Sequence, residues 1–248
     1  FSKCKSPNYQ ALTLLVLYAW RLRFQGCRVS FTLDNSESGA SQIWRMMGAQ
    51  SLFQVSTHED QNFRSNQFKP LIAIRGSADF KDALSKIEEY TSEFNVEYIN
   101  TLRYVLSELL YNTLEHGQSH FQYKGVQKRV PSLIQFAWYQ NNNEIHFLVA
   151  DTGIGIKQHL EQAYPGIESD EDAIKMAIRP QISGTFGKQD PYSGKNNAGV
   201  GLFLSSNIIR RIKADMHIVS GNGVLHISPR DITGCELQCK WPGTFILV

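Results

Sequence analysis

Long apolar runs are scarce in this chain of 248 residues. The longest, Ala11 to Trp20, covers ten residues and is followed closely by Arg21 and Arg23. A helix that crosses a bilayer needs roughly 20 apolar residues, so we expect a core helix here and no membrane anchor. No secretory signal pattern is visible in the sequence as given.

The chain also has few cysteines and a small net charge. The chain has four cysteines, and only Cys235 and Cys239 lie close together, with no second pair at zinc-finger spacing. We therefore expect reduced thiols and a cytoplasmic location. Because 25 basic and 23 acidic side chains leave a formal net charge of only +2, the sequence indicates no nucleic-acid partner.

The composition that is present is that of a folded globular protein. Hydrophobic residues make up 42% of the chain and charged residues 19%. The length suits one large domain or two unequal ones. Because the stretch from Ser56 to Pro70 is polar and reads as a linker, we predict a small unit at 1–68 and a larger one at 69–248.

The small unit is predicted to alternate helices and strands. We expect helices over 10–24 and 41–48, and strands over 27–33 and 52–55. This order resembles the second half of a STAS domain, so we predict a partial STAS-like α/β unit. The Asp-Ser-Ser-Gly motif of STAS phosphoacceptors is missing before the first helix, and no acceptor serine is assigned.

The larger unit is predicted to mix helices with a sheet. We expect helices at 78–94, 96–116, 170–178 and 199–214, and strands at 71–74, 133–139, 144–150, 216–220, 223–228, 236–240 and 245–248. The last four strands should form a meander. The connection over 157–198 is long for a passive loop, which favours a lid.

A polar stripe interrupts the apolar pattern of the helix at 96–116. Glu108, Asn112 and His116 recur every four residues and therefore border one face beside the leucine-rich core stripe. A solvated helix face is the plain alternative. The residue types also suit chemistry, because Asn112 can offer an amide oxygen to Mg²⁺ and Glu108 can orient or deprotonate a nucleophile.

Two glycine motifs lie further along the chain. Asp151-Thr152-Gly153-Ile154-Gly155 follows a predicted strand, where a buried carboxylate can accept a hydrogen bond from an exocyclic amine and glycines admit a flat ligand. Gly199-Val200-Gly201 opens a predicted helix, whose first N–H groups favour phosphate oxygens. Each motif alone could be a tight turn, but their order favours a site for adenine and phosphates.

Together these stretches resemble the GHKL ATPase superfamily, which includes gyrase B, histidine kinases and MutL and has the Bergerat ATP-binding fold. The matching elements are the N box Glu108-x-x-x-Asn112-x-x-x-His116, the G1 box Asp151 to Ile156, the G2 box Gly199 to Leu204, and a closing Gly243-Thr244. The resemblance covers roughly residues 71–248. It implies an α/β fold, an α+β two-layer sandwich, for this region, and the smaller STAS-like unit predicted from the element order would precede it.

The resemblance also implies cofactors and roles. It implies that ATP and Mg²⁺ bind, that Glu108 is catalytic, that Asn112 is the metal ligand and that 157–198 is the ATP lid. Lys188 and Lys195 lie in that lid, where they would either approach the phosphates or remain solvated. The cofactor-binding residues that it implies are Asn112, His116, Asp151, Gly153, Gly155, Ile156, Lys195, Gly199, Val200, Gly201, Leu202 and Thr244.

Among GHKL proteins, the chain looks most like the small anti-sigma-factor serine kinases, which act on STAS proteins. No phosphoacceptor helix of a histidine kinase and no transducer domain is readable. Three functions stay open: an Mg-ATPase that switches a protein partner, a serine/threonine protein kinase, and a non-hydrolysing ATP-binding module. The expected partner is a regulatory or STAS-type protein, and a homodimer is left open.

Overall fold

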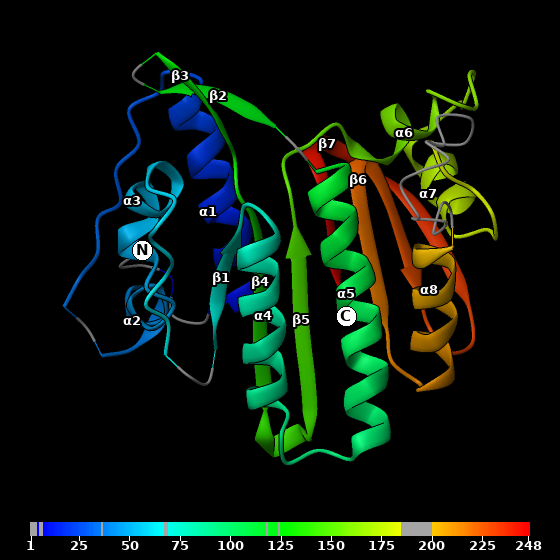
Figure 1. Ribbon diagram of the computed structural model, residues 1–248, viewed down its shortest axis with the longest axis horizontal. Helices are drawn as coiled ribbons and strands as arrows, with labels where there is room; N and C mark the ends of the chain where they lie inside the picture. Colours follow the sequence, from blue (N-terminus) through cyan, green and yellow to red (C-terminus); the bar gives the residue numbers. More distant parts are fainter. Residues whose placement is uncertain are drawn as a thin grey trace. The chain divides into compact units, whose positions relative to one another are not determined.

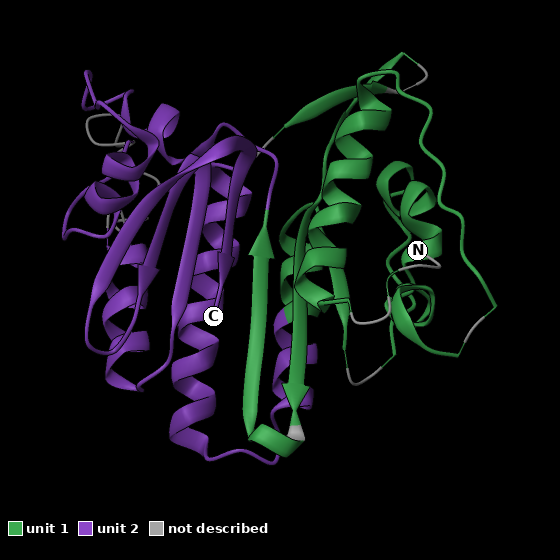
Figure 2. Cartoon of the chain, turned by 180° about the vertical axis from the view of Figure 1, so that it is seen from behind, with its two compact units in different colours: residues 1–83, 119–150 green, residues 84–118, 151–248 purple. Residues whose placement is uncertain are grey.

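The computed structural model describes residue 4 and residues 7–35, 37–66, 69–117, 119–123, 125–184 and 200–248. Its contacts divide the chain into two compact units (Figure 2). Unit 1 comprises Phe1–Ala83 and Ser119–Ala150, and unit 2 comprises Leu84–Gln118 and Asp151–Val248. The boundary at residues 68 and 69 stays a prediction, because compactness alone does not show where a chain folds independently.

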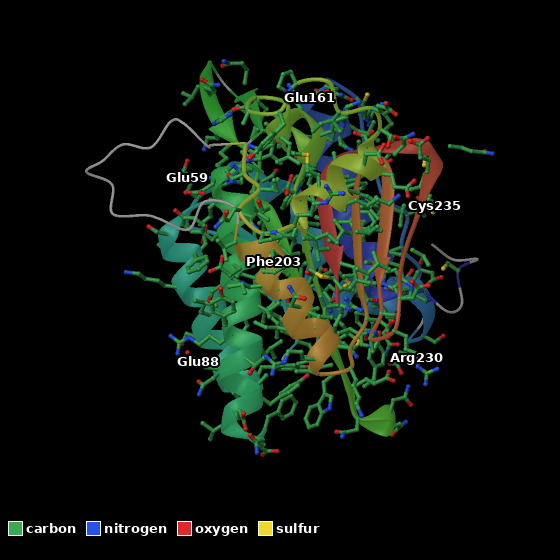
Figure 3. The ribbon with its side chains drawn as sticks, turned by 90° about the vertical axis from the view of Figure 1, so that its right-hand side faces the viewer. Glu59, Glu88, Glu161, Phe203, Arg230 and Cys235 are labelled. Atoms are coloured by element: carbon green, nitrogen blue, oxygen red, sulfur yellow. The ribbon has the colours of Figure 1, made fainter. Side chains whose placement is uncertain are left out.

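Unit 2 pairs a layer of helices with a layer of strands. Its elements are α5 (Val96–Glu115), α6 (Gly155–Leu160), α7 (Asp170–Ala177), α8 (Gly201–Arg211), β6 (Met216–Ile227) and β7 (Ile232–Leu247), and α4 (Ser77–Tyr90) enters it from unit 1. Helices α5 and α8, the latter marked by Phe203 in Figure 3, pack together on one side of β6 and β7 (Figures 1 and 3). The mixture of helices and antiparallel strands confirms the predicted α/β class.

Helix α5 forms where the sequence predicts it. The side chain of Asn95 caps its first turn by accepting a hydrogen bond from the Glu97 N–H at 2.9 Å. The residues buried along its inner face are Leu102, Val105, Leu106, Leu109 and Leu110. This spacing of three and four residues is that of one helix face, so the core stripe fixes which way Glu108 and Asn112 point.

The strands predicted after residue 215 lie within β6 and β7, but they do not form the predicted meander, because the last segment pairs with the first. The rings of His217 and His226 stack with centroids 4.3 Å apart, whereas an extended strand would separate positions nine residues apart by about 30 Å. The chain of β6 therefore reverses between them, at the register shifts beside Gly221 and Gly223. Residues 217–220 pair with 244–247, and residues 223–227 pair with 232–236.

Unit 1 contains a group of helices and antiparallel strands. Its elements are α1 (Tyr9–Phe24), α2 (Gly39–Met46), α3 (Leu52–Thr57), β1 (Leu71–Ile74), β2 (His120–Tyr123), β3 (Val126–Arg129), β4 (Ser132–Tyr139) and β5 (Glu144–Ala150). Strand β4 pairs antiparallel with both β1 and β5, and α1 packs on β4. The indole N–H of Trp20 donates to the Leu52 carbonyl at 2.6 Å, which joins α1 to α3.

The two strands predicted before residue 56 are wrong. Residues 27–33 form no regular element, and residues 52–57 are the helix α3. Half-buried and exposed residues do alternate over 29–33, but this segment contacts a helix and no strand is assigned to it. The ring centroid of Phe31 lies 4.7 Å from that of Trp44 in α2. At α3, the buried Leu52 and Val55 follow helical spacing, which a four-residue apolar run cannot distinguish from a strand. The STAS-like order of elements is therefore not observed.

The polar stretch after α3 covers the outer edge of β1. The side-chain amide of Asn62 donates to the Ala73 carbonyl at 3.0 Å, and its oxygen accepts from the Ala73 N–H at 2.9 Å. Ser65 Oγ donates to the Leu71 carbonyl at 3.0 Å and accepts from the Leu71 N–H at 2.9 Å. Two side chains thus satisfy the edge groups that a further strand would otherwise pair.

The sequence did not predict two features of the fold. The hairpin β2–β3 and the short helix α6 were not expected. The four cysteines are free and exposed. Within the described ranges, no helix is both long and apolar enough to cross a membrane.

Candidate functional site

Glu108 and Asn112 lie on successive turns of α5, half-buried beside its core stripe. Among the described residues, neither side chain has a hydrogen-bond partner. Burial raises the pKa of the Glu108 carboxyl above its usual value. A half-buried carboxyl group and amide that no described residue engages are candidates for contact with a ligand.

The start of α8 lies directly against Glu108. A methyl group on Gly201 would lie 3.3 Å from Glu108 Cδ and still closer to its Oε2, so only a glycine fits here without a shift. The first turn of α8 receives no side-chain cap from Val200. Its first N–H groups therefore lack an intrahelical acceptor and lie beside the carboxyl group. We call Glu108, Asn112 and the start of α8 the open edge.

Asp151 lies at the end of β5 and is only 5% exposed. Its Oδ1 accepts hydrogen bonds from the N–H groups of Gly153 at 2.8 Å and Thr244 at 3.2 Å. Its own N–H donates to the Thr244 carbonyl at 2.9 Å, and its carbonyl accepts from the Trp241 indole at 3.2 Å. These contacts fix the orientation of the carboxyl group before any ligand arrives.

A close approach of two backbones joins this aspartate to α5. A methyl group on Gly153 would lie 2.6 Å from the Gly117 backbone and 2.7 Å from the His116 carbonyl oxygen. Real side chains do not come so near, so the G1 turn can rest on the end of α5 only because Gly153 has no Cβ. The N box and the G1 box thus meet in space.

A buried serine completes this part of the site. Ser220 on β6 is 2% exposed and contacts the Ile156 N–H, the Gly243 carbonyl and the Thr244 hydroxyl. We call Asp151, Gly153, Ser220, Gly243 and Thr244 the carboxylate corner. Sequence reasoning missed both Ser220 and Trp241. The only indication of Ser220 in the sequence was a single serine between apolar strand residues and a glycine.

His116 ends α5, and its ring contacts a second histidine. The centroids of His116 and His159 are 3.9 Å apart. Burial lowers the pKa of His116, while burial and the His116 charge lower the pKa of His159 to about 4. His159 Nε2 accepts the Gly184 N–H at 3.2 Å, as a neutral imidazole can. A ligand-binding role for His116 stays a prediction.

The predicted lid begins with two helices. The second, α7, forms close to the predicted 170–178 and is anchored on β6, because Asp170 Oδ2 accepts the Asn222 N–H at 3.0 Å. Ile156 and Leu202 are half-buried in the first turns of α6 and α8. Lys188, Lys195 and Gly199 lie outside the described residues.

The family comparison agrees with this geometry. Residues 78–225, more than half of the chain, match the histidine kinase-like ATPase domain. The chain belongs to this family. The match contains the open edge and Asp151, confirms the predicted GHKL resemblance and supports ATP binding. Neither the search of curated proteins nor that of solved structures returned a match.

Proposed function

We propose that this histidine kinase-like domain binds Mg²⁺-ATP, hydrolyses it and uses the nucleotide cycle to switch a protein partner. The observation that carries the proposal is the position of the Glu108 carboxyl group beside the start of α8, which Val200 does not cap. Phosphate oxygens favour such a helix start, and a carboxyl group beside them is placed to act on whatever attacks the terminal phosphate.

The carboxylate corner would hold the adenine. A carboxylate has about four lone-pair sites, and the N–H groups of Gly153 and Thr244 donate to Oδ1 of Asp151. The exocyclic amine of adenine can donate to the same carboxylate. The hydrogen bonds that orient Asp151 come from the fold itself, so the group is preorganised for this contact.

The open edge would hold the phosphates and the metal. The amide oxygen of Asn112 is the kind of ligand that Mg²⁺ accepts, and Asn112 has no hydrogen-bond partner within the described chain. When bound, the ion would offset the charge of the phosphate oxygens. The first-turn N–H groups of α8 would share that task by donating to the same oxygens.

Glu108 would act as a general base. Burial raises the pKa of its carboxyl group, and a carboxylate of higher pKa is a stronger base towards water. The same group could accept a proton from a serine or threonine hydroxyl of a protein. The choice between hydrolysis and protein phosphorylation therefore depends on which nucleophile reaches Glu108.

The test uses γ-labelled ATP with the wild type, Glu108→Gln and the control Glu89→Gln, which changes an exposed glutamate on α4. We expect Glu108→Gln to bind ATP normally and to release phosphate about 10²–10⁴-fold more slowly. Wild-type hydrolysis in Glu108→Gln would contradict the proposed base. Label that moves to an added protein instead of to water would identify a kinase, and intact ATP after long incubation would identify a non-hydrolysing module.

A further inference from the structure

The buried Ser220 links three segments of the carboxylate corner. Its Oγ accepts the Ile156 N–H at 2.8 Å, donates to the Gly243 carbonyl at 3.0 Å and lies 3.2 Å from Thr244 Oγ1. Ser220 and Thr244 are direct partners across the β6–β7 ladder, so their side chains share one face. Gly155, with a φ of 78°, allows this approach: a methyl group there would lie 2.9 Å from Ser220 Oγ.

The protons of these two hydroxyl groups can be assigned from their partners. A hydroxyl has one proton and two acceptor sites. The Gly243 carbonyl can only accept, so it takes the proton of Ser220. The Ile156 N–H can only donate, so it occupies one acceptor site of Ser220 Oγ. The second acceptor site then receives the proton of Thr244, whose oxygen keeps only acceptor sites for other partners.

This assignment fixes what the corner presents to a ligand. Thr244 and Asp151 are joined by two hydrogen bonds. The Asp151 N–H donates to the Thr244 carbonyl, and the Thr244 N–H donates to Asp151 Oδ1. A carboxylate offers only acceptors, and Ser220 leaves Thr244 offering only acceptors as well. For contacts at position 6 of a purine, such a pair favours an amino group, which donates, and disfavours a carbonyl, which accepts.

We propose that Ser220 is a positioning residue that sets the purine preference of the site by holding the Thr244 hydroxyl proton away from the base. The inference rests on the proposed nucleotide-binding function and adds to it a source of selectivity that acts through Thr244 without touching the base. Ser220→Ala frees the Thr244 proton to turn towards the base. The variant should then tolerate a 6-carbonyl purine that the wild type rejects.

The test compares the magnesium complexes of ATP and ITP, which differ at position 6 of the purine, by titration calorimetry on the full chain. We expect the wild type to prefer ATP, and Ser220→Ala to narrow the ratio of the two affinities by about tenfold, chiefly by binding ITP more tightly. An unchanged ratio in a folded Ser220→Ala variant overturns the proposal. A wild type that binds neither nucleotide overturns the proposed function itself.

Two further variants keep the test decisive if Ser220→Ala does not fold. Thr244→Val removes the acceptor, so ATP affinity should fall more than ITP affinity, while Thr244→Ser keeps the hydroxyl and should retain the wild-type ratio. A wild-type ratio in Thr244→Val overturns the proposal. In a Thr244→Val background, adding Ser220→Ala should leave the ratio unchanged, because no hydroxyl is left to reorient; a further change there would also overturn it.

Discussion

At the carboxylate corner, Asp151, Ser220 and Thr244 are joined to the backbone and to one another by hydrogen bonds between 2.8 and 3.2 Å. At the open edge, by contrast, Glu108 and Asn112 have no hydrogen-bond partner in the part of the chain that the structure describes. The fold therefore orients the carboxylate corner before any ligand binds, and we expect the ligand itself to order the side chains of the open edge.

This difference separates two kinds of residue. Buried, hydrogen-bonded groups support the folded state, and removing one leaves its former partners unsatisfied. Half-buried groups without a hydrogen-bond partner among the described residues contribute little to the stability of the folded state. Variants of the carboxylate corner should therefore lower both stability and nucleotide affinity, whereas variants of the open edge should lower function alone.

The largest expected effect on binding is that of Asp151→Asn. Exchange of one carboxylate oxygen for an amide nitrogen removes an acceptor for the adenine amine, and a hydrogen bond to a charged group contributes about 1.5–3 kcal/mol. We expect ATP affinity, measured by calorimetry, to fall by about 10–100-fold. Asp60→Asn, on an exposed loop of unit 1, is the control. Equal affinity in the two variants would disprove the adenine assignment.

The next effect concerns stability. Gly153→Ala places a methyl group 2.6 Å from the Gly117 backbone, so the G1 turn and the end of α5 must move apart. Overpacking of this kind costs about 1–3 kcal/mol, which urea unfolding can measure. Gly76→Ala, where a methyl group meets nothing within 4 Å, is the matched control. If both variants unfold at the same urea concentration, the close approach is not formed.

Asn112→Ala tests the open edge. We expect it to weaken ATP binding by roughly tenfold when magnesium is present, because one oxygen ligand is lost, and to change little when magnesium is absent. Its free energy of unfolding should equal that of wild type. Asn100→Ala, on an exposed part of the same helix, serves as the reference. A loss of affinity that is equal with and without magnesium would reject Asn112 as the metal ligand.

Some of the structural features behind these predictions could be predicted from the sequence, and others could not. Helix α5 and the two glycine motifs could be predicted because their signals are local: apolar spacing, a cap and glycines next to polar residues. The contacts of Ser220 could not, because its partner Ile156 is 64 positions away in the chain. The false strand at 27–33 shows the reverse error, since alternation reports a buried face and not a neighbouring strand.

The smallest expected effect is a pH dependence. Burial holds the pKa of His159 at about 4 in the folded protein, below the ordinary value of 6.5, so the unfolded chain binds the proton first. The free energy of unfolding should therefore fall as the pH decreases from 6.5 to about 4. Below that pH, His159 should cause no further loss of stability. For this partly exposed group the loss is about 1–2 kcal/mol after allowing for solvent screening.

His159→Gln isolates this contribution. Glutamine keeps an acceptor for the Gly184 N–H and does not titrate, so the difference in unfolding free energy between pH 7 and pH 5 should shrink relative to wild type. His120→Gln changes an exposed histidine and should keep the wild-type difference. An identical pH dependence in wild type and His159→Gln would show that His159 is not held neutral by the fold.

A crystal structure with a non-hydrolysable ATP analogue and magnesium would show whether the carboxylate corner and the open edge form one Mg²⁺-ATP site. We expect a single site, with the adenine amine on Asp151, the phosphates at the start of α8, the Asn112 oxygen on the ion and a water within hydrogen-bond reach of Glu108. A nucleotide bound away from Asp151, or a Glu108 carboxyl turned away from the terminal phosphate, would contradict it.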